Sequence, residues 1–289
     1  MFDSTYYERL KRLKLAIEKK STASLIGSRK SSRKGSSAEF SDFREYMPGD
    51  DIRNIDWNAY ARLDRLYIKE YMEEKESSVS IFLDTSLSMT YMGKDSLMKD
   101  LAAALSYIAL VNMDQVKVYD LADVGNPHNA SGGKASFTNL LKKLDMTECS
   151  GSADIYKAIR QSGRMTPGMT IILSDFMSEE FMPGGDSMSL LLKYLKFMKQ
   201  DTVILHVLAK EELDIDLVGT YNLIDMENEE DKVKVTMDRR NILEYKKRLE
   251  EFTGGIKESC KRFGAAYYIC DTGRSFDRII FEDMRELYD

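Results

Sequence analysis

One short segment carries most of the chemistry that this sequence can support. The apolar run from Val79 to Leu83 predicts a buried strand, and a carboxylate and two hydroxyls follow it, Asp84, Ser86 and Ser88. Side chains that follow a buried parallel strand emerge at the carboxyl edge of the sheet, where open α/β folds place their ligands. Carboxylate and hydroxyl oxygens suit a hard divalent cation. The segment therefore predicts a site for Mg²⁺, with Mn²⁺ or Ca²⁺ as alternatives.

The spacing D-x-S-x-S resembles the metal-ion-dependent adhesion site of von Willebrand factor A domains. The resemblance implies a second carboxylate at the end of the neighbouring strand, and Asp175 matches that position. It also implies a threonine in a loop between the two, but Ala153 stands at the threonine position and Ser152 lies one residue earlier. The implied metal-binding residues are Asp84, Ser86, Ser88, Asp175 and Ser152. The simpler alternative is that these side chains only hydrogen-bond to backbone amides at the edge of the sheet.

From residue 79 onward, short apolar strands alternate with helices, which predicts a mostly parallel sheet covered on both faces. The fold class is thus α/β, an open and mostly parallel sheet flanked by helices, of the von Willebrand A type. We expect strands at 79–84, 116–120, 169–174, 202–208 and 266–269, and helices at 95–112, 136–145, 153–162, 187–199, 239–263 and 275–287. Residues 76–289 form this domain. Residues 1–75 form an N-terminal extension packed against it, with a helix at 5–20 and an edge strand at 66–74, and a hairpin-like excursion is expected at 217–225 and 232–236.

The extension contains a longer and more specific pattern. The segment from Arg44 to Arg62 reads R-E-Y-M-P-G-D-D-I-R-N-I-D-W-N-A-Y-A-R. It is similar to the signature of the family known as domain of unknown function 58, in which a Glu-rich strand and then a D-x-S-x-S motif follow. The resemblance implies a protein that acts with a MoxR-type AAA ATPase in the assembly or maturation of other proteins. It also implies that no catalytic activity is established for the family.

Arginines and aspartates alternate within this signature, around the only tryptophan, Trp57. The simpler interpretation is a set of ion pairs that hold the extension on the sheet, since a guanidinium can grip a carboxylate with two hydrogen bonds, with Trp57 packed as a hydrophobic anchor. The other interpretation is a recognition surface for the ATPase or for a client protein. That surface would consist of Arg44, Asp50, Asp51, Arg53, Asp56, Trp57 and Arg62.

Composition restricts the partners and the compartment. An apolar content of 43%, a charged content of 31% and a net charge of −6 are typical of a soluble globular protein and disfavour nucleic acid as a partner. No apolar run approaches a membrane span, and the three cysteines have no metal-ligand spacing, so we expect a cytoplasmic protein with reduced thiols. Residues 8–34 are locally basic, which indicates a solvated surface or contact with an acidic partner or an anionic membrane.

Most enzyme classes lack their required residues. Ser86 stands where a haloacid-dehalogenase phosphatase needs a second aspartate, and no G-x-S-x-G elbow or glycine-rich first turn is present. His128 is expected in a Gly/Asn/Pro loop and His206 in a strand as a half-buried residue. The sequence therefore predicts a non-enzymatic adaptor that docks an acidic residue of a partner through a bound metal ion. The alternatives are a metal-dependent hydrolase that uses Asp84 and Asp175, and an anionic-surface binder that uses the basic segment.

Overall fold

The structure is a computed structural model that describes residues 4–13, 15, 39–72, 77–132, 134–182, 184–215, 219–224 and 232–288. The chain divides into two compact units, one of residues 20–76 and one of residues 1–19 and 77–289. Helix α1 (Ser4–Leu10) belongs to the second unit because Tyr6 and Leu10 pack in its core. The sequence-based boundary had left this helix with the extension. Of the basic segment 8–34, only residues 8–13 and 15 lie among the described residues.

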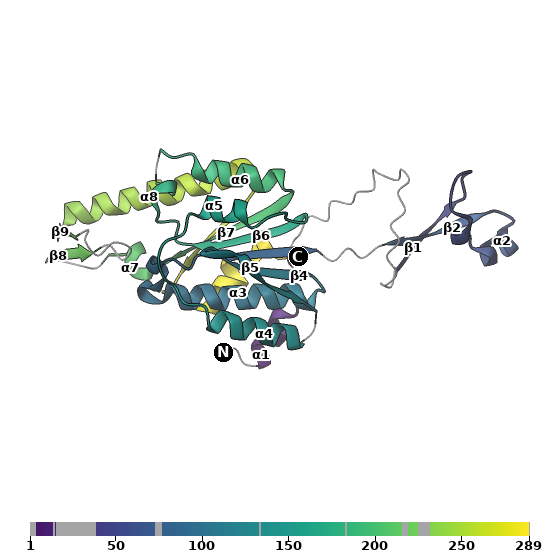
Figure 1. The fold of residues 1–289 in the computed structure, drawn as a ribbon, viewed down its shortest axis with the longest axis horizontal. Coiled ribbons are helices and arrows are strands. Elements are labelled where there is room, and N and C mark those ends of the chain that lie inside the picture. The colour runs from purple at the N-terminus through teal and green to yellow at the C-terminus, as the bar shows by residue number, and fades with distance from the viewer. Residues whose placement is uncertain are drawn as a thin grey trace. The chain divides into compact units, whose positions relative to one another are not determined.

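The larger unit is built on a six-stranded sheet with the order β10-β7-β6-β3-β4-β5. All neighbouring strands run parallel except β5, which pairs antiparallel with β4. This arrangement confirms the predicted α/β fold with an open, mostly parallel sheet (Figure 1). The strands are β3 (Ser78–Leu83), β4 (Gln115–Asp120), β5 (Asp123–Ser131), β6 (Gly168–Ser174), β7 (Gln200–Leu208) and β10 (Ala266–Asp271).

Helices cover both faces of the sheet, so its central strands are buried on both sides. Every residue of β3 is buried, as expected for a strand between two helical layers. Val79 and Ile81 belong to one core with α3 and α4, whereas Phe82 belongs to the other with α5, α6 and α8. Figure 1 shows α5, α6 and α8 on one side of the sheet and α3 and α4 on the other. The helices are α3 (Lys94–Val111), α4 (Lys134–Asp145), α5 (Ile155–Gln161), α6 (Ser187–Phe197), α7 (Lys210–Leu213), α8 (Arg239–Phe263) and α9 (Phe276–Arg278).

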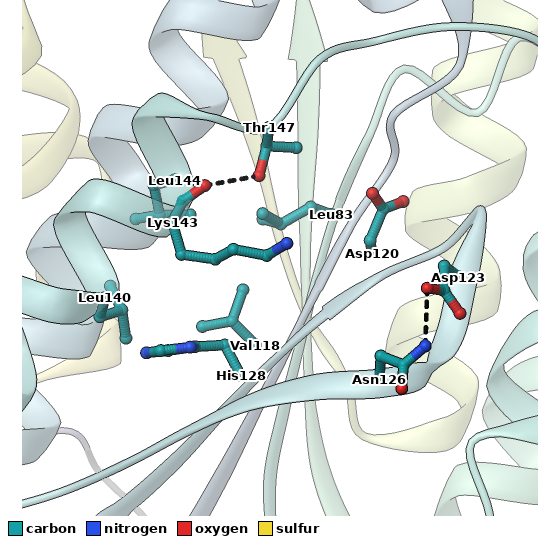
Figure 2. Close-up of a pocket in the computed structure, with 10 residues that line it drawn as sticks. All are labelled: Leu83, Val118, Asp120, Asp123, Asn126, His128, Leu140, Lys143, Leu144 and Thr147. Carbon is teal, nitrogen blue, oxygen red and sulfur yellow. Dashed lines mark hydrogen bonds between the residues drawn. The ribbon is translucent and has the colours of Figure 1, made fainter.

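The predicted loop around His128 is wrong, because this residue lies in strand β5. The Gly125, Asn126 and Pro127 residues indicate a turn in the sequence, but β5 is an edge strand, where a proline without an amide hydrogen is tolerated. His128 lines a small hollow of about 70 Å³ between β4, β5 and α4. Figure 2 shows its ring near Leu140 and Val118, on the far side of the hollow from Asp120.

Two predicted helices are shorter or more broken than expected. The N-terminal helix ends at Leu10, and Leu15 already forms an isolated bridge with Tyr288. The predicted C-terminal helix is instead α9, a π-helical turn at Ile279–Asp283 and a 3₁₀ turn at Arg285–Leu287. Ile279 and Ile280 are adjacent in sequence and both fully buried in the same core. This segment therefore packs into the core through a π-helical turn rather than along a continuous α-helix.

The remaining elements are small. The predicted hairpin is confirmed as the antiparallel pair β8 (Gly219–Ile224) and β9 (Lys232–Met237). The unit of residues 20–76 contains an antiparallel pair, β1 (Glu39–Glu45) and β2 (Tyr67–Met72), and between them a 3₁₀ turn (Ile52–Asn54) and α2 (Trp57–Leu63). None of the helices that the structure describes combines the length and the apolar character needed to cross a bilayer.

Candidate metal and docking site

Asp84 directly follows β3 at the carboxyl edge of the sheet. Its Oδ1 accepts the backbone N–H of Ser86 at 3.0 Å, and its Oδ2 accepts the hydroxyl of Ser174 at 2.5 Å. Asp84 is only 4% exposed, and this burial raises its pKa. The hydrogen bonds from Ser174 and Ser86 oppose the rise, whereas the negative charge of the nearby Asp175 adds to it. No cation pairs with Asp84 among the described residues. A divalent cation beside this carboxylate would supply the missing positive charge.

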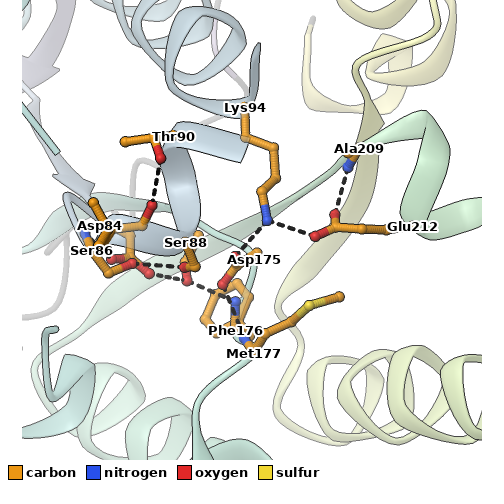
Figure 3. Close-up of polar contacts among 12 residues, drawn as sticks. Asp84, Ser86, Ser88, Thr90, Lys94, Asp175, Phe176, Met177, Ala209 and Glu212 are labelled. Atoms are coloured by element: carbon orange, nitrogen blue, oxygen red, sulfur yellow. Dashed lines mark hydrogen bonds and ion pairs between the residues drawn. The ribbon is translucent and has the colours of Figure 1, made fainter. Parts of the chain in front are cut away.

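Ser86 and Ser88 present their hydroxyls side by side, with their Oγ atoms 3.1 Å apart (Figure 3). Adjacent oxygen ligands of an octahedral Mg²⁺ lie about 2.9 Å apart, because each metal–oxygen bond is about 2.0–2.1 Å. The observed separation is therefore close to that of two ligands that share one cation. The same separation also permits a hydrogen bond between the two hydroxyls.

Backbone hydrogen bonds bring the loop before α5 to the same place. The N–H of Ser150 donates to the carbonyl of Thr85 at 2.7 Å, and the N–H of Leu87 donates to the carbonyl of Gly151 at 2.8 Å. A hollow of about 280 Å³ opens between this loop and the strand ends. All five residues predicted to bind metal line it, together with Ala153 and three further carboxylates, those of Asp154, Glu179 and Glu180.

Asp175 follows β6, and its side chain is already paired. Its Oδ2 accepts Lys94 Nζ at 2.7 Å, and its Oδ1 accepts the N–H of Met177 at 3.0 Å. The same Nζ donates to Glu212 Oε1 at 2.8 Å, so one ammonium bridges two carboxylates (Figure 3). The Lys94 side chain is 1% exposed. Burial lowers the pKa of Lys94, but the charges of Asp175 and Glu212 outweigh this effect and raise it above its usual value, so the lysine remains charged.

Sequence reasoning missed Lys94, although one signal was available. Lys94 is the first residue of α3 and follows Gly93, whose φ of 79° is readily adopted only by glycine. A cation at a helix N-terminus is unfavourable with respect to the helix dipole. A lysine in that place, before an apolar helix, therefore indicates a buried anion nearby.

Two further titratable groups near the hollow were also missed or misjudged. Burial raises the pKa of Glu180 to about 7, and Asp154 adds to this rise, while the N–H of Ile155 donates to Glu180 at 3.0 Å and opposes it. His206 is fully buried rather than half-buried. Its Nδ1 lies 2.8 Å from the Tyr267 hydroxyl and its Nε2 lies 2.8 Å from the carbonyl oxygen of Asp175. Burial lowers the pKa of His206 to about 4, so this side chain is a neutral structural link.

The signature residues belong to the unit of residues 20–76, whereas the residues that line the hollow lie between positions 84 and 180 of the sequence. Arg44 grips Asp50 with two hydrogen bonds of 3.0 Å, an ion pair within that unit. The other two aspartates cap helical turns: Asp51 accepts the N–H of Arg53, and Asp56 accepts the N–H groups at positions 58 and 59. Arg53 and Arg62 are exposed.

Among the described residues of the unit of residues 20–76, Trp57 lies at the surface, and its role as an anchor of the extension on the sheet stays a prediction. Its side chain is 63% exposed and makes an edge-on contact with Tyr60, at 6.3 Å between ring centroids. Position 57 begins α2 directly after the capping residue Asp56, and no residue of this short helix is buried. The helix therefore presents the ring outward.

The side chains around Asp84 suit a weakly held cation. No group of three or more His, Cys, Asp or Glu side chains in the described ranges is arranged to hold a metal ion. A set made of Asp84, Ser86 and Ser88 has only one carboxylate and two hydroxyls. Such a set fits Mg²⁺, which retains several waters when few carboxylates coordinate it. Ala153 offers no side-chain oxygen, which removes one ligand from the set that the sequence resemblance implies.

Comparisons with known proteins identify a family rather than an activity. The family described as "Protein of unknown function DUF58" matches residues 42–251. The uncharacterized proteins Rv1480 of Mycobacterium tuberculosis and Mb1516 of Mycobacterium bovis are each 29% identical over 104 residues, which is 36% of this chain. The chain thus spans about a third of the length of these curated relatives, 33% of each.

Among solved structures, the human COPII-coat protein Sec24c aligns with a TM-score of 0.41 and 8% identity, over 73% of this chain and 32% of that one. A similarity at this level carries no argument about function. The family match, in contrast, covers well over half of the residues and includes both the Arg44–Arg62 signature and the residues of the hollow. On this evidence the chain belongs to the DUF58 family.

Proposed function

We propose that this protein is a non-enzymatic adaptor that docks an acidic side chain of a partner protein through a divalent cation held by Asp84, Ser86 and Ser88. The observation that carries the proposal is the acidic hollow itself. Two buried oxygen-bearing strand ends meet there, and the Asp84 carboxylate has no cationic partner among the described residues. A volume of about 280 Å³ leaves room for a cation with its waters and for an incoming side chain.

The charge of the hollow determines how docking would depend on metal. Five carboxyl side chains line it, those of Asp84, Asp154, Asp175, Glu179 and Glu180, and Asp175 is the one that pairs with a lysine among the described residues. Without a bound cation, these groups repel a partner's carboxylate. With Mg²⁺ present, the ion has open coordination positions that a carboxylate can fill in place of water. An acidic partner therefore requires the metal ion, whereas a basic partner would bind better without it.

The partner that the sequence resemblance suggests is a MoxR-type AAA ATPase in the cytoplasm, with a separate client protein. The hollow would then act as a von Willebrand A-type adhesion site. The exposed apolar side chains of the unit of residues 20–76, Trp57 among them, supply a second surface for the same complex. Exposed aromatic side chains often contribute strongly to protein interfaces.

The geometry gives less support to a hydrolase that uses Asp84 and Asp175. Asp175, the second carboxylate that this hydrolase needs, is engaged by the Lys94 ammonium and by the N–H of Met177. A general base must reach the proton that it removes with an available lone pair. Neither histidine fills this role, because His206 is held by Tyr267 and the Asp175 carbonyl, and His128 lines the separate hollow beside β5.

Calorimetric titration with Mg²⁺ and Mn²⁺ tests the proposal directly. Asp84→Asn should abolish the binding heat, whereas Asp123→Asn, an exposed aspartate outside the hollow, should leave it unchanged. Binding to a MoxR-type ATPase from the same source, measured by biolayer interferometry, should be lost on chelation. Identical null heats for wild type and Asp84→Asn, or tighter ATPase binding after chelation, would exclude the metal-bridged mode. Turnover of a phosphoester that requires Asp84 would favour the hydrolase.

A further inference from the structure

A second concave surface shares no lining residue with the acidic hollow. It is a groove of about 540 Å³ with strand β10 on one side and the middle of helix α8 on the other. The strand contributes Tyr267, Tyr268 and Ile269, and none of these is a residue of the hollow. The groove therefore needs an explanation of its own.

Strand β10 is the end strand of the six-stranded sheet and pairs only with β7 in the described part of the sheet. An end strand presents a row of backbone N–H and C=O groups to which a further strand can bond. The first four of the six residues of β10 are only partly buried, and the buried Cys270 follows them. This edge is therefore accessible to a strand from another chain.

Helix α8 contains two adjacent glycines, Gly254 and Gly255, in the middle of its 25 residues. Each glycine in a helix interior costs about 1 kcal/mol relative to alanine. A Cβ atom built at either position meets no described atom within 4 Å, so packing within the chain does not require a glycine there. A glycine that the chain itself does not need indicates that another backbone approaches closely from outside.

The charges on the groove side of α8 indicate which molecule approaches. Four residues of this helix line the groove in the order Glu250, Thr253, Gly254 and Lys257. A two-fold axis that passes between Thr253 and Gly254 places each Glu250 opposite Lys257 of a second copy. The two small residues then lie on the axis, where the helices come nearest. Neither Glu250 nor Lys257 forms an ion pair with another described residue.

The same axis suits the strand. The middle of α8 and the middle of β10 line one groove, so a single axis can run beside both. It would set β10 antiparallel to its copy and join the two six-stranded sheets edge to edge. A two-fold interface uses the same patch on both subunits, which the arrangement of Glu250 and Lys257 allows.

The geometry points to a symmetric dimer of this protein, formed by α8 against α8 and β10 against β10. The acidic hollows lie outside this interface, so each dimer would present two of them. Two linked docking sites raise the apparent affinity for a multivalent partner, such as a ring-shaped assembly, without any new contact. The dimer does not depend on the metal site, and its test leaves that site unchanged.

Charge exchange on the full-length chain tests the dimer, with the mass measured by light scattering and analytical ultracentrifugation over a range of concentrations. Glu250→Lys and Lys257→Glu each place two like-charged pairs across the axis, and each should weaken dimerisation about tenfold or more. The double variant Glu250→Lys/Lys257→Glu should recover the dimer. An equimolar mixture of the two single variants should also recover it, as a heterodimer with two opposite-charge pairs.

Glu148→Lys and Lys142→Glu are matched controls, since both residues are exposed on or beside α4 and outside the groove. They should leave the mass unchanged. A wild-type protein that stays monomeric at every concentration would overturn the inference. So would a dimer that is insensitive to the single variants, or single variants that do not recover on mixing. Circular dichroism of each variant separates loss of the dimer from loss of folding.

Discussion

Replacing Lys94 by methionine should destabilise the α/β unit by about 3–5 kcal/mol, because the change leaves buried carboxylates without their counter-ion. Methionine keeps most of the aliphatic stem, so lost packing contributes little. The ammonium bridges Asp175 at 2.7 Å and Glu212 at 2.8 Å, and the side chains of these residues are 3% and 15% exposed. Water therefore cannot easily replace the lost charge. We place the effect toward the upper end of this range, since two carboxylates lose the same partner.

The matched control is Lys99→Met in the same helix. Lys99 lies 3.8 Å from Asp95, in a pair whose side chains are 22% and 36% exposed. Exposed pairs of this kind contribute about 0–1 kcal/mol. The two lysines thus differ mainly in burial. A destabilisation by Lys94→Met as small as that by Lys99→Met would refute the buried-charge reasoning.

Urea unfolding monitored by far-UV circular dichroism is the appropriate assay, with the free energy of unfolding extrapolated to water. Tryptophan fluorescence is not suitable, because the only tryptophan, Trp57, belongs to the unit of residues 20–76. Adding Asp175→Asn to Lys94→Met should restore part of the stability, since the double variant buries one charge fewer. A coupling energy of about 1–3 kcal/mol between the two changes would confirm that they act on one ion pair.

Three further predictions concern the hollow and the side chains around it, and a fourth concerns Trp57 in the unit of residues 20–76. Ala153→Thr restores an oxygen at the rim and should tighten Mg²⁺ binding on the order of tenfold by calorimetry, whereas Ala153→Val should not. The pKa of His206 is lowered to about 4, so only the unfolded state binds a proton between pH 6.5 and 4. As the pH falls over that range, the wild-type protein should therefore lose up to about 3 kcal/mol of unfolding free energy relative to His206→Gln, measured by urea unfolding. The pKa of Glu180 is raised to about 7, so the unfolded state ionises first. Glu180→Gln should therefore gain stability relative to wild type as pH rises from 4.5 to 8 in thermal melts, and a constant difference would contradict the raised pKa. Trp57→Ala, at a 63% exposed position, should change stability by less than about 0.5 kcal/mol yet weaken ATPase binding measured by interferometry.

The sequence predicts the parallel core of the sheet well because its strands are continuous apolar runs. Residues 78–83 and 168–174 are buried on both faces, and such runs between helices have few alternative structures. Prediction failed at β5, whose Gly125-Asn126-Pro127 run favours a turn when read locally. Pairing with β4 overrides that preference. It also failed at Ile279–Asp283, where tertiary packing selects a wider helical turn that no local pattern indicates.

At the candidate site, the sequence predicted the residues that directly follow the ends of strands. It did not predict the residues that other helices contribute. Asp84 and Asp175 each end a strand, and β3 and β6 are neighbours, so their convergence follows from the topology alone. Lys94 and Glu212 lie 118 positions apart and meet only after the helices that carry them are placed. A resemblance to a known motif identifies the candidate metal ligands, but it does not identify the charged side chains that pair with those ligands. Those counter-charges depend on burial, which the sequence does not specify residue by residue.

The two aspartates of the hollow differ in a way that bears on the proposed metal binding. Asp175 has a built-in cation in Lys94, so its charge is compensated whether or not a metal ion is present. In the part of the chain that the structure describes, Asp84 has hydrogen bonds but no cationic partner, and burial raises its pKa. The resident lysine lets the strand ends fold without metal, while the uncompensated Asp84 still favours a cation. Binding of Mg²⁺ should therefore stabilise the wild-type fold only modestly, by RT ln(1 + [Mg²⁺]/Kd). In Lys94→Met, where both carboxylates lack a counter-ion, the same ion should stabilise the fold more strongly. Equal stabilisation of the two proteins by Mg²⁺, measured by thermal shift, would show that Lys94 and the metal ion act on unconnected charges.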